Sequence, residues 1–479
     1  MKRPRKTKII ATLGPATSAY ATIRRLFEEG VDVFRLNFSH GTHKEHQERL
    51  ASIRLLEKEK NHSIGVIVDL QGPKLRLGHF AQPCVFLRSG TIFRFDRDKR
   101  EGDERGVYVP HPEIFDIARI GQDILLDDGK VRLKVVEKGA SWIDANVITG
   151  GEISSHKGMN IVGSVMTDQA ILTAKDKADF DFAMTLDIDW IALSFVRDVG
   201  DIEKVRSLIP RQCPVHLLTK MENQAAINNL ESIIEASDAV MVARGDLGVE
   251  LPPEVVPIQQ KRIINACRRI GKPVVVATHM LDSMVHSSAP TRAEASDVAT
   301  AVYDGADAVT LSAETAVGKH PCESVCMMNK VICSVEGDSV YRSIIENWHP
   351  PSRTKVSDAI SAAAAQAADT LNAASIVTYT ESGSTARLAS RERSHVGILG
   401  ISTAKTTARQ LSMTWGVYCV VAEGIQSVNH MVEEACQVAL QEEVAQIGDI
   451  VVITAGIPFG KAGSTNMMRI ARLKNIKSR

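Results

Sequence analysis

The sequence predicts an α/β protein built on a (β/α)8 TIM barrel, with an inserted β-rich lid domain and a C-terminal open α/β domain. Short β-branched runs alternate with amphipathic helical stretches over most of the first two-thirds of the 479 residues. The runs are apolar throughout, as in strands of a parallel sheet that is covered on both faces. Polar and charged side chains follow these strands directly, and this is where the active site of such a barrel assembles.

The barrel is defined by strand candidates that fall in two blocks of the chain, 1–70 and 166–345. Helices are expected in the intervals, one starting at Thr167-Asp168 and another ending at Gly271. The expected strands begin at Lys8, Val31, Ser63, Trp190, Pro214, Asp238, Pro273 and Asp307.

The segment 71–165 has a different residue pattern from the barrel blocks. It alternates apolar and polar residues, as in TIFRFDRD from Thr91, and has turn signals at Asp128-Gly129 and Gly150-Gly151. These features predict a small β-rich domain. The chain leaves the barrel directly after a strand to form this segment, which places it above the barrel mouth. We therefore expect it to act as a lid that excludes water from the reaction. An inert insertion is the alternative.

The last segment, 346–479, has the linker-like sequence HPPSRTK near its start and continues as a separate α/β pattern. A helix rich in Ala is expected from Ser357, followed by the strands SIVTYT, VGILGIS, VYCVVAE and DIVVITAG. We interpret this segment as an open-sheet regulatory domain.

Composition excludes several classes of function. Lys plus Arg and Asp plus Glu both count 57, so no overall charge would attract nucleic acid or a membrane surface. The eight Cys are scattered without metal-site spacing, which is typical of thiols in a reducing compartment. No stretch approaches the ~20 apolar residues of a membrane span. We therefore expect a cytoplasmic protein.

Two carboxylates and one ammonium are expected to converge at the ends of neighbouring strands. Lys220 and Glu222 share a face in KMENQ, and Asp246 follows the next strand in ARGDLGVE. Neighbouring strands lie ~5 Å apart, so one ligand can contact all three groups. Two carboxylates that leave room for substrate and water suit Mg²⁺ or Mn²⁺. Separate structural ion pairs are the alternative.

Two arginines add positive charge near this point. Arg35 lies in RLNFSHG, and Arg76 lies in GPKLRLG at the root of the insert. Guanidinium groups beside a divalent metal are what a transferring phosphoryl group requires, because catalysis there is mostly positioning and charge neutralisation.

The motifs resemble those of pyruvate kinase. The segments that carry the resemblance are TKIIATLGPAT, VDVFRLNFSHGTH, VDLQGPKLRLG, LLTKMEN, VMVARGDLGVEL and SSAPTRAEASDVATAVYDGADAVTLSAETAVGKHP. They occur in order and cover nearly the whole chain. The resemblance implies phosphoryl transfer from phosphoenolpyruvate to ADP, giving pyruvate and ATP, by a homotetramer.

The resemblance also implies roles for individual residues. Glu222 and Asp246 would hold Mg²⁺, Lys220 would stabilise the moving phosphoryl group, and Arg35 with Arg76 would hold phosphate oxygens. Thr278 would lie near the enolate carbon, and backbone N–H groups would bind the substrate carboxylate. The substrate-binding residues implied are Arg35, Lys220, Ala243, Arg244, Gly245, Asp246 and Thr278, and those at the monovalent-cation position are Asn37, Ser39, Asp69 and Leu70.

One position departs from the potassium-requiring members. They resemble D-T-K-G-P-E where this chain has Asp69-Leu70-Gln71-Gly72-Pro73-Lys74, so Lys74 replaces a Glu. An ammonium on a four-carbon stem can take the place of K⁺, and we therefore predict activity without potassium. The alternative is that Lys74 points to solvent.

A second anion site is expected in the C-terminal domain. TESGST, from Thr380 to Thr385, offers hydroxyl and backbone N–H groups at a strand-to-helix turn. By resemblance this is the allosteric phosphate loop, formed by Thr380, Glu381, Ser382, Gly383, Ser384 and Thr385. Members activated by fructose 1,6-bisphosphate tend to carry Lys where Glu381 stands. We therefore expect activation by a monophosphate, a sugar phosphate or AMP, with Gly456–Thr465 closing over it; a loop without ligand is the alternative.

Two other functions fit parts of the pattern. Keto-acid aldolases and lyases on related barrels also hold an enolate on Mg²⁺, but they lack the RLNFSHG and PTRAEASDVA segments and need no nucleotide. A non-catalytic effector-binding relative would show damage at the metal or lysine positions, whereas Lys220, Glu222, Asp246 and Thr278 all match.

Overall fold

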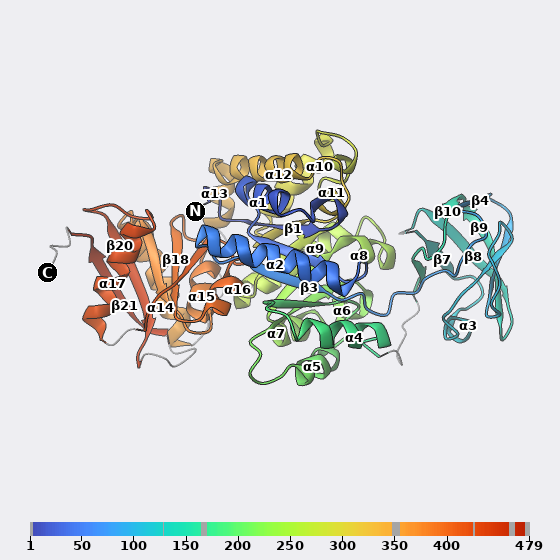
Figure 1. Cartoon of the computed structure of the whole chain (residues 1–479), viewed down its shortest axis with the longest axis horizontal. Helices are drawn as coiled ribbons and strands as arrows, with labels where there is room; N and C mark the ends of the chain where they lie inside the picture. Colours follow the sequence, from blue (N-terminus) through green and yellow to red (C-terminus); the bar gives the residue numbers. More distant parts are fainter. Residues whose placement is uncertain are drawn as a thin grey trace.

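The computed structural model describes residues 3–127, 129–163, 170–346, 355–424, 427–458 and 465–474. Three parts lie along one line: the C-terminal domain, the barrel in the middle and the inserted domain at the far end (Figure 1). The predicted TIM barrel, inserted β-rich domain and C-terminal α/β domain are therefore confirmed. Among the described residues, no helix is long and apolar enough to cross a bilayer.

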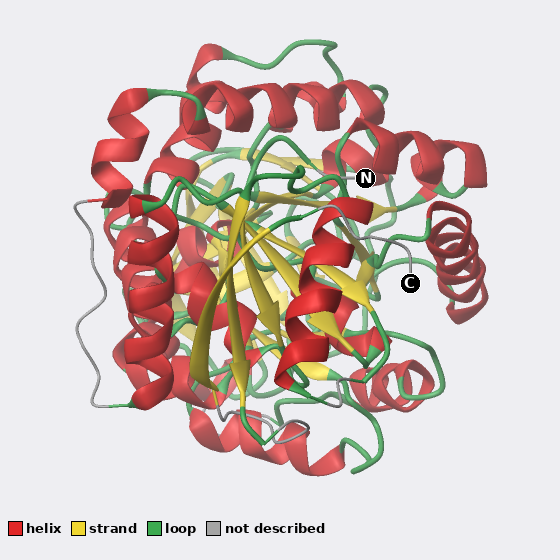
Figure 2. Cartoon of the chain, turned by 90° about the vertical axis from the view of Figure 1, so that its left-hand side faces the viewer, coloured by secondary structure: helices red, strands yellow, loops and turns green. Residues whose placement is uncertain are grey.

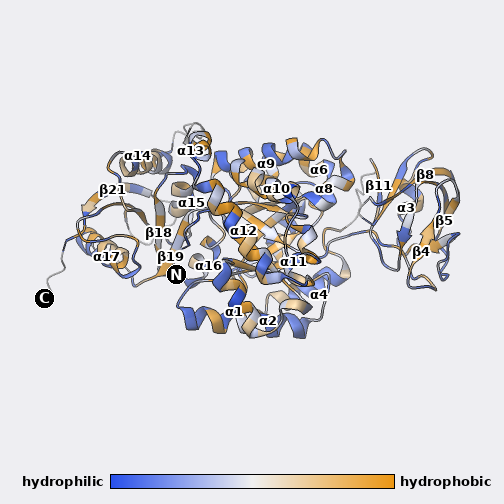
Figure 3. Ribbon diagram, turned by 90° about the horizontal axis from the view of Figure 1, so that it is seen from above, coloured by the Kyte–Doolittle hydropathy of each residue, from blue (hydrophilic) through white to orange (hydrophobic). Residues whose placement is uncertain are grey.

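The barrel is a closed parallel sheet in the order β1-β16-β15-β14-β13-β12-β3-β2. Side chains inside it include Trp190 and Leu218, which are fully buried, and its outer side packs on the surrounding helices. Figure 3 shows hydrophobic residues along the barrel strands and hydrophilic residues on the outer surfaces of the helices. The strands are β1 (Lys8–Leu13), β2 (Val33–Asn37), β3 (Gly65–Asp69), β12 (Trp190–Leu193), β13 (His216–Met221), β14 (Ala239–Ala243), β15 (Val274–Ala277) and β16 (Ala308–Leu311).

Helices around the barrel begin and end at capping residues. Thr42 and Glu45 form a capping box at the start of α2, and Gly271, with φ 75°, ends α9 as predicted. The helices are α1 (Tyr20–Glu29), α2 (His43–Lys60), α4 (Ala174–Ala183), α5 (Val199–Leu208), α6 (Gln224–Asn228), α7 (Leu230–Ala236), α8 (Arg244–Glu250), α9 (Val256–Ile270), α10 (Arg292–Tyr303), α11 (Ala313–Ala316), α12 (Pro321–Glu336) and α13 (Ser339–Glu346), with short 3-10 turns η1 (Pro15–Thr17) and η2 (Asp282–Val285).

One helix start was placed wrongly from the sequence. α4 begins at Ala174, and its cap is Thr173, whose hydroxyl accepts a hydrogen bond from the Asp176 N–H. The expected cap at Thr167-Asp168 lies outside the described residues. Both sites offer a Thr with an acidic residue within the next three positions, and the sequence pattern did not distinguish them.

The inserted domain has its own core. A six-stranded sheet, in the order β11-β7-β8-β9-β5-β6, lies beside a two-stranded sheet, β10-β4. Its buried apolar side chains form a cluster separate from those of the barrel. Its elements are β4 (Val85–Leu87), β5 (Ile92–Asp96), β6 (Gly106–Tyr108), α3 (Ile114–Ile117), β7 (Asp123–Leu126), β8 (Val131–Lys138), β9 (Trp142–Thr149), β10 (Gly151–Ile153) and β11 (Met159–Ile161).

Two short segments, 73–77 and 157–161, join this domain to the barrel, and we call them the neck. They pair as an antiparallel ribbon: the Leu77 N–H donates to the Lys157 carbonyl at 2.9 Å, and the Met159 N–H donates to the Leu75 carbonyl at 3.0 Å. The inserted domain thus extends from the mouth of the barrel on a two-stranded stem (Figure 1).

The C-terminal domain is a five-stranded sheet in the order β19-β18-β17-β20-β21, with helices against it (Figure 2). The antiparallel edge strand β21 was not expected from the sequence. The elements are α14 (Val356–Thr370), β17 (Ser375–Tyr379), α15 (Ser384–Arg391), β18 (Gly397–Ser402), α16 (Lys405–Leu411), β19 (Val417–Val421), α17 (Val428–Gln441), β20 (Ile450–Gly456) and β21 (Thr465–Arg472).

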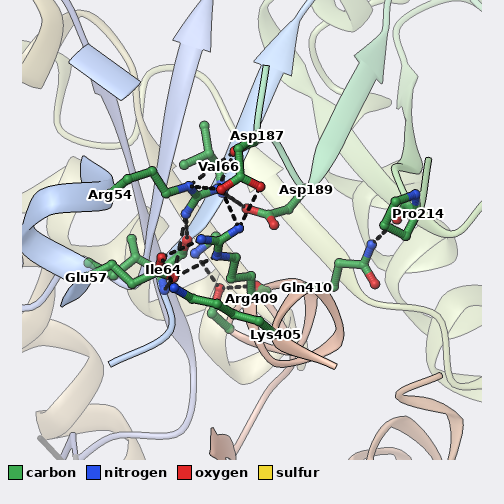
Figure 4. Close-up of polar contacts among 12 residues, drawn as sticks. Arg54, Glu57, Ile64, Val66, Asp187, Asp189, Pro214, Lys405, Arg409 and Gln410 are labelled. Atoms are coloured by element: carbon green, nitrogen blue, oxygen red, sulfur yellow. Dashed lines mark hydrogen bonds and ion pairs between the residues drawn. The ribbon is translucent and has the colours of Figure 1, made fainter. Parts of the chain in front are cut away.

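This domain docks on the N-terminal ends of the barrel strands through α16 (Figure 4). The buried Arg409 guanidinium donates to both carboxylate oxygens of Glu57, at 2.8 and 2.5 Å, and to Asp187 at 2.8 Å. Gln410 donates to the Pro214 carbonyl at 2.5 Å. Two residues beyond α16, Met413 is fully buried in the cluster that fills the barrel interior. The two domains therefore share part of a core.

Candidate active site

A buried ion cluster lies at the carboxyl ends of three neighbouring strands, β3, β12 and β13. The Lys220 ammonium lies 2.7 Å from Glu222 Oε1, donates to Ser194 Oγ at 2.8 Å and lies 3.4 Å from Asp69 Oδ1. Asp69 and Glu222 are 1% and 0% exposed. Parallel strands bring these residues together because their carboxyl ends meet at one rim of the barrel.

Lys220 is held in its charged form. Burial by itself lowers the pKa of its ammonium, but Asp69, Glu222 and Asp246 outweigh burial and raise that pKa above the ordinary lysine value. The same attraction, with that of Arg35, holds the pKa of Asp69 below its usual value despite burial. Lys220 therefore carries a positive charge at neutral pH.

Glu222 and Asp246, the predicted metal ligands, lie on adjacent elements. The Phe195 N–H donates to Glu222 Oε2 at 2.7 Å, and Asp246 lies in the first turn of α8. Burial raises the pKa of Glu222, against the lowering effect of Lys220, and Asp246 raises it further. Glu222 Oε1 is buried and lies 2.7 Å from the Lys220 ammonium.

This donor set fits a divalent cation. An additional positive charge would relieve the mutual repulsion of two carboxylates, one of them fully buried. Within the part of the chain that the structure describes, no group of three or more His, Cys, Asp or Glu side chains is placed to hold a metal. An open site in which Glu222 and Asp246 bind the metal, and substrate and water supply the other oxygens, stays a prediction.

Arg35 and Arg76 lie in different surroundings. Arg35 donates to Asp69 Oδ2 at 2.7 Å and to Thr12 Oγ1 at 2.9 Å, so its guanidinium belongs to the buried cluster. Arg76 is in the neck and donates to the His156 carbonyl of the inserted domain at 2.9 Å. Both lie near His40, whose pKa is lowered by burial and then by Arg76 and Arg35. Arg76 is thus near the mouth but attached to the domain above it.

Thr278 lies against the beginning of α8. It has φ 77°, a left-handed conformation that is uncommon for a β-branched residue and marks a strained site. A Cβ on Gly245 would approach Thr278 Cγ2 to 2.7 Å, so glycine is required for this close contact. The Arg244 side chain donates to the Thr278 carbonyl and to Asp297, both at 2.6 Å. Arg244 therefore holds Thr278 in place, and the sequence did not indicate this role of Arg244.

Lys74 contacts the site directly. Its ammonium donates to Asp246 Oδ1 at 2.7 Å, so the alternative that it points to solvent does not hold in this structure. The residues at the expected monovalent-cation position lie at the ends of β2 and β3: the Ser39 N–H donates to Asn37 Oδ1 at 3.1 Å, and the Leu70 carbonyl accepts from Ser194. The substitution of potassium by Lys74 stays a prediction.

The side chains that fix Lys220 and Arg35 were not among the predicted site residues. Ser194 and Thr12 accept hydrogen bonds from them at 2.8 and 2.9 Å. Glu314 holds two loops at the rim, accepting from the Leu281 and Ser312 N–H groups. In the sequence, only their positions within or directly after barrel strands indicated that they could belong to the site. This indication was weak, because hydroxyl and carboxylate groups are common at strand ends.

The expected effector loop forms a turn between β17 and α15. Gly383 has φ 82° and precedes α15, and the Arg387 guanidinium donates to the Ser382 carbonyl at 3.0 Å. Ser382 Oγ and Ser384 Oγ lie 3.3 Å apart, and the buried Thr380 Oγ1 has no hydrogen-bond partner among the described residues.

The structure describes only part of the remaining effector site. The Glu381 carboxylate accepts from Thr403 Oγ1 at 3.1 Å, so it is engaged inside the domain. Thr385 Oγ1 and Thr465 Oγ1 lie 2.7 Å apart, which brings the end of the segment Gly456–Thr465 next to the loop. Residues 459–464 of that segment lie outside the described residues.

Two family models match the chain. The pyruvate kinase barrel domain matches residues 4–325, and the pyruvate kinase alpha/beta domain matches residues 358–471. Pyruvate kinase of Methylorubrum extorquens is 46% identical over 98% of both chains, and that of Geobacillus stearothermophilus is 40% identical over 97% of this chain and 80% of its own. The crystal structure of a pyruvate kinase from Cryptosporidium parvum superposes with a TM-score of 0.89, at 34% identity, over 98% of this chain and 96% of that chain. The chain belongs to the pyruvate kinase family.

Proposed function

We propose that the chain transfers the phosphoryl group of phosphoenolpyruvate to ADP, giving pyruvate and ATP, at the mouth of the barrel. Membership of the family makes it a phosphotransferase. The observation that carries the proposal is the buried cluster of Lys220, Glu222 and Asp69 with Asp246 beside it. Two acidic ligands and a permanent ammonium are what a phosphoryl group needs for charge neutralisation.

Glu222 and Asp246 would hold Mg²⁺, or Mn²⁺, in this site. When bound, the metal would act as a Lewis acid that neutralises charge on the phosphoryl and enolate oxygens. Lys220 supplies the fixed positive charge of the protein: its ammonium is held by Ser194 and by two carboxylates, so it needs no reorganisation when the phosphoryl group leaves.

Arg35 and Arg76 would hold the phosphate from two sides. Arg35 is oriented by Asp69 and Thr12 on the barrel, whereas Arg76 belongs to the neck. Movement of the inserted domain would therefore change the position of one cation but not of the other. This supports a role for that domain as a lid that completes the site and excludes water.

Thr278 would lie near the enolate carbon, and the N–H groups from Ala243 to Asp246 would bind the substrate carboxylate. Their relative position is fixed, because Gly245 packs on Thr278 and Arg244 holds the Thr278 carbonyl. Reacting groups held this closely lose little entropy on reaching the transition state.

We propose that the enzyme needs no potassium, and the contact of Lys74 with the site supports this. Its ammonium already places a monovalent positive charge against Asp246, at 2.7 Å. The test is pyruvate formation from phosphoenolpyruvate and ADP with Mg²⁺, in a buffer free of K⁺ and NH₄⁺. Full turnover in that buffer is expected. Turnover only after KCl is added would refute the role of Lys74 and keep the phosphoryl transfer, whereas no turnover under either condition would refute both.

We also propose that a phosphorylated metabolite activates the enzyme from the loop Thr380–Thr385. Hydroxyl groups at a helix start favour an anion, and Glu381 in the loop disfavours a second phosphate. Titration with AMP, a sugar monophosphate and a sugar bisphosphate tests this, and strong activation by the bisphosphate alone would contradict it.

The homotetramer implied by the family resemblance and the expected cytoplasmic location stay predictions. Light scattering measures the oligomeric state.

A further inference from the structure

Both segments of the neck are fastened to the same short helix, α8. On the outgoing segment, Lys74 donates to Asp246 Oδ1 at 2.7 Å. On the returning segment, the Asn160 amide donates to Glu250 Oε1 at 3.0 Å. Asp246 and Glu250 are four residues apart and therefore lie on one face of α8, one turn from each other. The lid is thus joined to the helix that carries a proposed metal ligand.

Strand alternation explains why these two side chains reach the barrel. Leu75 and Leu77 on one segment, and Met159 and Ile161 on the other, are buried in the core of the lid. Residues between them must face the opposite side of the ribbon. The neck consequently moves with the lid, and Asn160 faces away from the lid core, towards α8.

Apolar packing does not replace this hydrogen bond. A cavity of about 270 Å³ lies between the neck and the barrel, lined by Leu75, Met159, Ile161, Phe195, Asn160 and Glu250 among others. Close-packed side chains do not fill this space, so the neck is held to α8 here by the contacts of Lys74 and Asn160.

We propose that Glu250 is a positioning residue for the lid: through Asn160 it fixes the neck on the helix that carries Asp246. The hydrogen bond has a defined direction, because an ionised carboxylate only accepts, so the amide nitrogen of Asn160 faces Glu250. The inference rests on the proposed role of the lid in the reaction. Loss of the contact would leave the barrel site intact and allow the lid to adopt several angles.

An exchange of the two functional groups tests this pair. Asn160→Asp places two carboxylates against each other, and Glu250→Gln keeps an acceptor for Asn160. The double variant, Asn160→Asp with Glu250→Gln, restores the hydrogen bond in the reverse direction, because the amide introduced on α8 can donate to the carboxylate introduced on the neck.

We expect Asn160→Asp to lower kcat about tenfold, which corresponds to the free energy of one charge-assisted hydrogen bond. The KM for phosphoenolpyruvate should change by less than about twofold. The double variant should recover most of kcat. Asn146→Asp, which adds the same charge to β9 of the lid away from the neck, is the matched control.

The angle of the lid is measured directly with spin labels. Cys84 is the exposed cysteine of the eight and lies in the lid, and Lys44→Cys on the exposed start of α2 gives a partner on the barrel. Electron–electron double resonance should show a broader distance distribution in Asn160→Asp and a narrow one in the double variant. Unchanged distance and kcat in Asn160→Asp, or a double variant as impaired as Asn160→Asp, would overturn the proposal.

The same labels separate this inference from the proposed function. Addition of Mg²⁺, phosphoenolpyruvate and ADP to the otherwise unsubstituted labelled protein is expected to shorten the distance between the labels. A distance that stays constant would refute closure of the lid, whereas the comparison of the variants decides the role of Glu250 on its own.

Discussion

The barrel carries a domain at each end, and the two are attached by different means. At the N-terminal ends of the strands, the C-terminal domain contributes Arg409 to a buried ion cluster and Met413 to the barrel core. At the mouth, the lid stands on a two-stranded neck, and its core is separate. A shared core resists rotation, whereas a ribbon with two polar contacts permits it. The difference predicts that one end contributes more to stability and supports the movement proposed for the other.

The chemistry is distributed in the same way. The ion cluster of Lys220, Glu222 and Asp69 belongs to the barrel alone, and the second phosphate-binding cation proposed, Arg76, belongs to the lid. A site that is complete only when the lid approaches can exclude water at the moment of transfer. The rigid end then keeps the barrel strands, and with them the cluster, in place.

The largest effect on stability is expected at the docked end. Arg409→Met removes the bidentate partner of Glu57, which is 3% exposed and keeps contacts with Lys405 at 3.2 Å and Arg54 at 3.6 Å. We therefore expect a loss of about 3 kcal/mol, the lower end of the cost of breaking a buried pair. Thermal or urea unfolding measures this. The matched lid variant is Arg94→Met. The Arg94 side chain, which pairs with Asp144, is 43% exposed, so its loss should lower the free energy of unfolding by less than about 1 kcal/mol. Equal losses for the two variants would contradict the contrast between the ends.

The largest effect on activity is expected in the cluster under the lid. Lys220→Met removes the fixed positive charge while preserving length, and we expect kcat/KM for phosphoenolpyruvate to fall about 10²–10³-fold, the cost of removing one preorganised group. Steady-state pyruvate formation measures this. Lys177→Met, at an exposed position of α4, should have no effect. Activity of the Lys220 variant within threefold of the unsubstituted protein would refute its role.

A smaller effect concerns pH at the docked end. Burial raises the pKa of Asp189 from 3.8 to about 6, although Arg54 opposes the shift. The folded state therefore binds this proton more tightly than the unfolded state, and the contribution of Asp189 to stability falls as pH rises from about 4 to about 6. The loss is about 2–3 kcal/mol.

Asp189→Asn removes that titration and isolates it from other groups. The difference in unfolding free energy between the unsubstituted protein and the Asn variant should change across this pH range and be constant above it. A difference that does not vary with pH would show that Arg54, at 2.8 Å, keeps Asp189 ionised throughout.

The smallest effect is expected at the neck. Lys74→Glu places a carboxylate next to Asp246, and we expect activity without K⁺ to fall about tenfold and to return when KCl is added. Lys177→Glu is the control for the change of charge. Equal activity of the Lys74 variant with and without KCl would mean that the ammonium does not take the place of potassium.

The sequence by itself determined the barrel and the residues at its rim. Apolar β-branched runs form buried strands because their side chains fit a sheet that is covered on both faces, and caps such as Gly271 end helices through local backbone geometry. Since parallel strands meet at one rim, Lys220 and Glu222 could be placed together before any contact was known.

Only the tertiary structure decided how the parts meet. The pairing of Lys74 with Asp246 and of Asn160 with Glu250, the attachment of Arg76 to the lid and the burial of Arg409 on Glu57 all join residues distant in sequence. Each depends on the packing of whole domains, which fixes the distance between two side chains to within one hydrogen bond. Local propensity and periodicity extend over a few turns or strands, and they contain no information about that distance.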